Sequence, residues 1–72
     1  MITVGIVANR FKPKARLVIK NFVDLLYEAD AQALYAAENA EFLKLTPSER
    51  TVPLAQLGDH CQVVVAFGGD GT

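Results

Sequence analysis

The chain has 72 residues, of which 51% are hydrophobic and 21% charged, and its formal net charge at pH 7 is −1. This length allows one small domain, and the composition fits a globular protein and not a disordered one. A net charge this small provides no basic field that would attract nucleic acid. No apolar run approaches the roughly 18 residues that cross a membrane, the opening residues do not have the form of a signal peptide, and the single cysteine allows no internal disulfide. We therefore expect a cytoplasmic protein without membrane partners.

The first third of the chain predicts a strand followed by a helix. Ile2–Ala8 is rich in β-branched residues, and the small Gly5 within it could let a helix or a ligand come close. Pro13 suits the first turn of a helix that we expect to run to about Ala29. The apolar residues of this helix step by three and four along one face, at Ala15, Val18, Ile19, Phe22, Leu25, Leu26 and Ala29. A strand followed by an amphipathic helix is typical of the start of a βαβ unit.

The middle of the chain predicts a second strand and short helical segments. The alanines of Gln32–Ala36 also favour helix, and only the expected alternation of strand and helix decides for a strand. We expect a helical turn within Glu38–Leu45, with its apolar side chains inward, and a short helix at Pro53–Leu57, with an exposed loop at Thr46–Arg50 between them.

The last eleven residues carry the strongest chemical signal. Val63–Phe67 is an uninterrupted apolar run, which predicts a strand buried on both faces of a parallel sheet. It leads directly into Gly68-Gly69-Asp70-Gly71-Thr72. The glycines permit positive φ angles and close approach of a ligand, and successive N–H groups in such a turn can bind an anion. Asp70 would repel a bare phosphate, so the loop indicates Mg-nucleotide binding or deprotonation of an alcohol. A tight turn without a ligand is the alternative interpretation.

The order of elements predicts an α/β fold. Three strands separated by helical segments form a three-layer, right-handed βαβαβ half of a doubly wound parallel sheet, with strand order 2-1-3. The winding reverses at the first strand, and ligands bind beyond the carboxyl ends of the strands at such a point. Asn9 and Arg10, which follow the first strand, then become candidate nucleotide contacts beside the glycine loop. Asn9 is equally a turn former, and the cations from Arg10 to Arg16 equally suit the solvated start of a helix.

His60 and Cys61 are adjacent but do not predict a catalytic or metal site. Neighbours along an extended segment point to opposite sides, and no second cluster of ligand residues accompanies the pair. We expect a structural role for both, at the end of the last strand that is opposite the site.

Gly68–Thr72, placed after a hydrophobic strand, resembles the GGDGT signature of the NAD kinases, and Ile2–Ala8 and the order of elements extend the resemblance loosely over the whole chain. The wider superfamily includes diacylglycerol and sphingosine kinases and, more distantly, 6-phosphofructokinases. Lipid kinases of this superfamily typically show Asn-Pro and then Ser-Gly after the first strand, where this chain has Asn9 followed by Arg10. Phosphofructokinases carry a second glycine-rich loop there, which this chain lacks, so NAD kinases fit best.

The resemblance implies transfer of the γ-phosphate of ATP, with Mg, to the 2′-hydroxyl of NAD, which gives NADP. Asp70 would act on the hydroxyl or on its metal environment, and the loop would be shaped by Gly68, Gly69, Gly71 and Thr72. Residues 1–72 would be the N-terminal part of the α/β nucleotide-binding domain, without the β-rich C-terminal domain of the family, and would be inactive alone. We expect the complete enzyme to be a homo-oligomer. The alternatives are a fragment of a diacylglycerol- or sphingosine-type lipid kinase and a non-catalytic, flavodoxin-like nucleotide-binding module.

Overall fold

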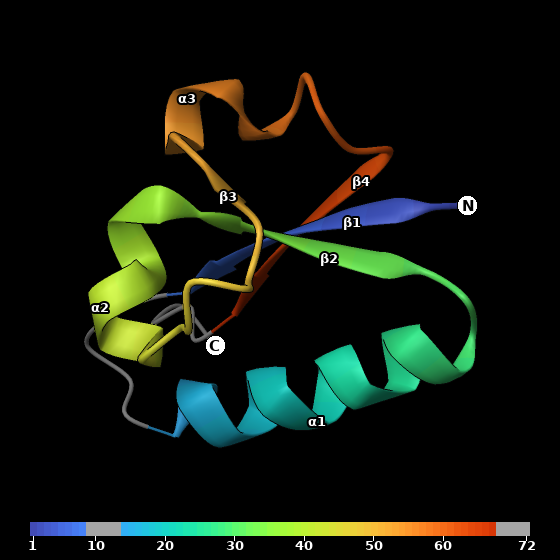
Figure 1. Ribbon diagram of the computed structural model, residues 1–72, viewed down its shortest axis with the longest axis horizontal. Coiled ribbons are helices and arrows are strands. Elements are labelled where there is room, and N and C mark those ends of the chain that lie inside the picture. The colour runs from blue at the N-terminus through green and yellow to red at the C-terminus, as the bar shows by residue number, and fades with distance from the viewer. Residues whose placement is uncertain (9–13, 68–72) are drawn as a thin grey trace.

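A parallel four-stranded sheet, in the order β3-β2-β1-β4, forms the centre of the molecule (Figure 1). The structure is a computed structural model that describes residues 1–8 and 14–67. The predicted α/β class is confirmed, and the predicted order 2-1-3 is present as β2-β1-β4. In chain order the elements are β1 (Thr3–Ala8), α1 (Ala15–Glu28), β2 (Gln32–Ala36), η1 (Ala37–Asn39), α2 (Ala40–Leu43), β3 (Thr51–Val52), α3 (Leu54–Leu57) and β4 (Val63–Phe67).

The sheet has one strand more than the sequence predicted. β3 pairs with β2 over two residues, with Tyr35 opposite Thr51 and Ala36 opposite Val52, and the N–H of Tyr35 also donates to the carbonyl of Arg50 at 2.9 Å. Two residues are too few to show an alternating pattern, and Pro53 follows at once, so the sequence predicted no element at Thr51–Val52. Only its pairing with β2 makes it a strand.

The face that helix α1 presents to the sheet matches the predicted stripe only in part, because Ile19, Phe22 and Leu26 pack in the core and other members of the stripe do not. Ile19 and Val23 are buried, whereas Val18 and Leu25 of the predicted stripe are 52% and 61% exposed. The helix has more apolar residues than one face of the sheet covers. Their spacing therefore fits two overlapping stripes, and the sequence does not say which stripe is buried. Within residues 1–8 and 14–67, no helix is long and apolar enough to cross a membrane.

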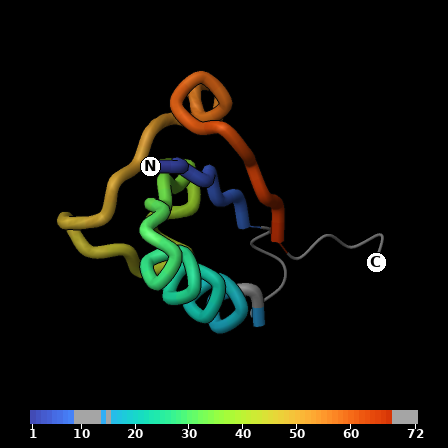
Figure 2. The backbone as a smooth tube through the Cα atoms, turned by 90° about the vertical axis from the view of Figure 1, so that its right-hand side faces the viewer, coloured from blue at the N-terminus to red at the C-terminus, as the bar shows by residue number. Residues whose placement is uncertain are grey.

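Hydrophobic side chains pack on both faces of the sheet, with α1 and α3 on opposite sides (Figure 2). On the α1 face, Ile6 and Tyr35 pack with Ile19 and Val23, and the predicted inward residues Phe42, Leu43 and Leu45 lie against this cluster. On the α3 face, Leu34 and Ala36 pack with Leu57. Ile6 of β1 is fully buried, at 0% exposure, and β1 and β2 are the two inner strands of the sheet.

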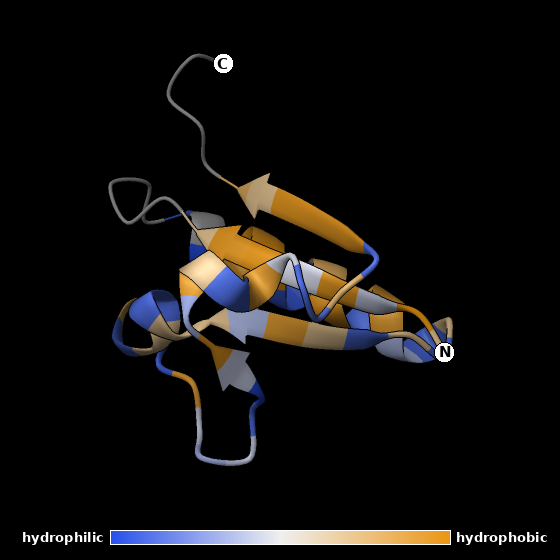
Figure 3. Cartoon of the chain, turned by 90° about the horizontal axis from the view of Figure 1, so that it is seen from above, coloured by the Kyte–Doolittle hydropathy of each residue, from blue (hydrophilic) through white to orange (hydrophobic). Residues whose placement is uncertain are grey.

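Strand β4 is not buried on both faces, contrary to the prediction from its apolar run. In the described part of the chain it pairs only with β1 and forms an edge of the sheet, hydrophobic along its length (Figure 3). Val63 is 51% exposed and Val64 47%. An apolar run predicts a strand, but it does not say which elements cover that strand.

The sequence suggested close approach at Gly5, and the structure confirms it. A Cβ atom at this position would lie 2.7 Å from the Sγ atom of Cys61 and 3.0 Å from the Cγ atom of Leu57. We expect Gly5→Ala to lower the free energy of unfolding by about 1–3 kcal/mol through overpacking, measured by urea denaturation.

The matched control is Gly58→Ala, because Gly58 has a helical φ of −65° and a Cβ atom there would meet nothing within 4 Å. This change should leave stability unchanged or raise it by about 0.4–1 kcal/mol. Equal urea midpoints for Gly5→Ala and the unchanged chain would show that β1 and α3 pack more loosely than described.

Candidate functional site

The candidate site lies at the carboxyl ends of β1 and β4, where the winding of the sheet reverses. The chain moves from β1 to β2 on one side and returns to β4 on the other side of β1. The register places Ala8, the last residue of β1, opposite Phe67, the last residue of β4. Both strands run in the same direction, so their carboxyl ends lie side by side at the same end of the sheet (Figure 1). This is the position at which open α/β sheets bind ligands.

The residues predicted to contact the nucleotide lie outside the described residues. These are Asn9 and Arg10 after β1, and Gly68, Gly69, Asp70, Gly71 and Thr72 after β4. The structure does describe the residue that precedes each group, and those two residues are register partners. The two segments are therefore attached at neighbouring positions of the sheet, while the roles of their side chains remain predictions.

The end of β4 is held against helix α1 by an aromatic contact. The ring of Phe67 packs on the ring of Phe22, with centroids 5.3 Å apart and an interplanar angle of 59°. Tilted aromatic pairs at this distance are favourable beyond the area that they bury. The contact fixes the residue that directly precedes the glycine loop.

Asn39 bonds to the carboxyl end of β1, and the sequence analysis did not single it out. Its side chain is buried, its Oδ1 accepts a hydrogen bond from the N–H of Ala8 at 2.9 Å, and its Nδ2 donates to the carbonyl of Ala8 at 3.0 Å. Asn39 precedes α2 as its N-cap, but its side chain makes no capping hydrogen bond. An asparagine before a helix normally indicates a cap, so the sequence carried no signal for a contact with a residue 31 positions away.

His60 and Cys61 lie near the opposite end of the sheet, as expected. The N–H of Gln62, the next residue, donates to the carbonyl of Thr3 at the start of β1, at 3.0 Å. Cys61 donates its S–H to the carbonyl of Leu57 at 2.9 Å, and His60 is exposed. Among residues 1–8 and 14–67, no group of three or more His, Cys, Asp or Glu side chains could hold a metal ion.

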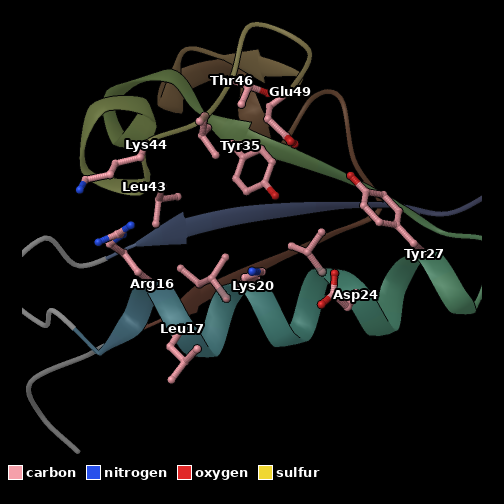
Figure 4. Close-up of a pocket in the computed structure, with 13 residues that line it drawn as sticks. Arg16, Leu17, Lys20, Asp24, Tyr27, Tyr35, Leu43, Lys44, Thr46 and Glu49 are labelled. Atoms are coloured by element: carbon pink, nitrogen blue, oxygen red, sulfur yellow. The ribbon is translucent and has the colours of Figure 1, made fainter.

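A separate open groove of about 710 Å³ lies between α1 and the segment that follows β2 (Figure 4). Its charged lining is mixed, with cations at Arg16, Lys20 and Lys44 and carboxylates at Asp24 and Glu49. Tyr35 of β2 also lines it. Burial, with additional repulsion from Glu49, raises the pKa of the Tyr35 phenol to about 12. Opposite α1, the groove is lined by Leu43, the last residue of the 4-residue α2, and by the segment that follows it.

Two NAD kinases are similar to this chain along almost all of its length. The NAD kinase of Marinomonas sp. (strain MWYL1) is 32% identical over 69 residues, which are 96% of this chain and 23% of that protein. The NAD kinase of Desulforamulus reducens (strain ATCC BAA-1160 / DSM 100696 / MI-1) is 31% identical over 72 residues, which are 100% of this chain and 24% of that protein. The predicted relationship is thereby confirmed, and the chain spans about a quarter of the length of these relatives. No protein-family model and no solved structure matches the chain.

The raised pKa of Tyr35 predicts a pH dependence of stability. The folded state keeps the phenol protonated up to about pH 12, whereas the unfolded chain loses this proton near pH 10. The contribution of Tyr35 is therefore complete below pH 10 and is lost as the pH rises towards 12. We expect urea midpoints to fall between about pH 9 and about pH 11.5, and to fall less in Tyr35→Phe. An equal fall in both proteins would contradict the raised pKa.

Proposed function

We propose that this chain, which is related to the NAD kinases, forms the nucleotide-binding part of an enzyme that transfers the γ-phosphate of ATP to the 2′-hydroxyl of NAD. The observation that carries this proposal is the register of β1 and β4, which pairs Ala8 with Phe67 at the switch point of the sheet. The GGDGT sequence follows Phe67 directly. A glycine-rich segment leaving a strand at that point is well placed to meet the phosphates of a nucleotide.

In this proposal Asp70 accepts the proton of the attacking 2′-hydroxyl or takes part in ordering Mg. Gly68, Gly69 and Gly71 let the main chain approach the phosphates, and Thr72 adds a hydroxyl. Asn9 and Arg10 reach the nucleotide from the neighbouring strand, and the charge of Arg10 offsets that of a phosphate.

The donor set of the glycine loop fits Mg that is shared with the substrate. The loop has one carboxylate, and Mg is usually held by one or two carboxylates together with phosphate oxygens and water. When bound, Mg would neutralise charge on the phosphates during transfer.

The rest of the enzyme completes the site in this proposal. Phosphoryl transfer depends on holding two substrates in line, and the chain spans about a quarter of the length of its NAD kinase relatives. We therefore propose that a β-rich domain and a homo-oligomeric assembly contribute what these residues lack. The 72-residue chain alone should form no NADP from ATP, Mg and NAD.

Asp70→Asn, made in the complete protein that carries these residues, tests the proposal. The amide keeps the size of the side chain but cannot act as a base and is a weaker metal ligand. We expect turnover for NADP formation to fall roughly 10²- to 10⁴-fold, with an unchanged thermal midpoint. The measurement is steady-state kinetics with varied NAD, paired with a thermal melt of the same preparation.

The matched control is His60→Ala, because His60 is exposed and lies near the opposite end of the sheet. It should leave turnover nearly unchanged. Asparagine favours turns as well as aspartate does, so near-normal turnover in Asp70→Asn would reduce Asp70 to a turn residue and remove the catalytic assignment.

A further inference from the structure

We propose that Asn39 is a positioning residue for the switch-point site, and that its side-chain amide holds Ala8, the last residue of β1, in place. This inference rests on the proposed function for the identity of the ligand, a nucleotide bound beyond the ends of β1 and β4. It assigns Asn39 no contact with the nucleotide.

The backbone of β1 bonds alternately to its two neighbouring strands. The carbonyl of Ile2 accepts from Gln32, the first residue of β2, whereas Thr3 bonds to Gln62 on the β4 side. In a parallel strand the N–H and C=O groups of one residue point to the same neighbour. Ala8 therefore directs both of its groups towards the β2 side, as Ile2 does.

Strand β2 ends too early to supply partners for Ala8. The register of β1 with β2 ends at Ile6 opposite Tyr35, and β2 itself ends at Ala36. The side-chain amide of Asn39 supplies one donor and one acceptor in the place of the missing peptide unit, at 3.0 and 2.9 Å. It continues the hydrogen bonding on the β2 side of β1 from Ile6 to Ala8, the last residue of the strand.

Because Asn39 is buried, its amide cannot be exchanged for an apolar group without loss of these hydrogen bonds. Apart from the phenol of Tyr35, the side chain of Asn39 is the only polar or charged one that is buried among the described residues, with 6% exposure. Buried amides are costly unless they are hydrogen-bonded, and this one satisfies two backbone groups of a single residue. An apolar residue of similar size would fill the same space and leave both groups of Ala8 without these partners.

The hydrogen bonds of Asn39 affect the position of the end of β1 relative to the end of β4. On the β4 side, Ala8 is in register with Phe67, and Phe67 is held by Phe22. On the β2 side, Asn39 alone bonds to Ala8 among the described residues. Loss of the amide would let the end of β1 shift relative to the end of β4, and a misplacement of about 1 Å can cost up to about 100-fold in rate.

The test compares three variants of the complete protein that carries these residues. Asn39→Ala removes both hydrogen bonds to Ala8. Gln62→Ala is the matched amide control, because the side chain of Gln62 accepts from the N–H of Thr3 at 2.8 Å, at the opposite end of β1. Leu57→Ala is the stability control, since Leu57 is 1% exposed and packs on the α3 face. The Kd values for ATP and for NAD, and kcat/KM for NADP formation, are measured at a temperature at which every variant is folded.

We expect Asn39→Ala to weaken nucleotide binding and to lower kcat/KM by roughly 10- to 100-fold, while both controls stay within about 3-fold of the unchanged protein. Amide hydrogen exchange at Ala8 should accelerate in Asn39→Ala and not in Gln62→Ala. Normal Kd and kcat/KM values in Asn39→Ala would overturn the inference. Equal losses in Leu57→Ala would overturn it too, because they would assign the effect to stability.

The same measurements separate this inference from the proposed function. A protein that binds nucleotide but forms no NADP would overturn the catalytic proposal, and the Kd values of the variants would still decide the role of Asn39. A protein that binds neither ATP nor NAD would overturn both.

Discussion

The hydrogen bonding of the β1 backbone on both of its sides is the interaction on which the rest of the structure depends. Among the strands of the described residues, only β1 is paired along most of its length on both sides, and it carries the fully buried Ile6. Side-chain amides bond its backbone at both ends, Gln62 at Thr3 and Asn39 at Ala8. The bonds at Ala8 are buried, where a peptide group without a partner is costly, whereas the bond at Thr3 is exposed. The relative position of the two segments beyond the sheet follows from this strand.

The elements with strong local patterns were predictable from the sequence. Val63–Phe67 has the bounds that its apolar run predicted. Gln32–Ala36 also has its predicted bounds, but there the expected alternation of strand and helix decided for a strand, not a local pattern. The order 2-1-3 expected of a doubly wound sheet is present around β1. The pairing of Thr51–Val52 was not predictable, because a strand of two residues has no periodicity. The buried face of α1 was predicted only in part, since Ile19 and Phe22 face the core but Val18 does not. Choosing between overlapping apolar stripes requires knowledge of the surface that the helix covers.

The candidate site also has parts that the sequence revealed and parts that depend on contacts between distant residues. A glycine-rich segment with one acid after an apolar strand is visible in the sequence, and the relationship to NAD kinases supports its interpretation. The adjacency of the ends of β1 and β4 followed from fold topology and is confirmed by the pairing of Ala8 with Phe67. Asn39 could not be found in this way, because its side chain bonds to a residue distant in sequence and its local position suggests a helix cap.

The short crossover between β2 and β3 has a consequence for how such a sheet can vary. The helical turns η1 and α2 do not cover the whole α1 face of β2, and the groove beside Tyr35 is the space left over. A longer helix could occupy that space without changing the order of the strands, because β3 joins the sheet at its far edge. The crossover is therefore the place where this fold can gain residues at little cost, provided that the asparagine at its beginning is retained.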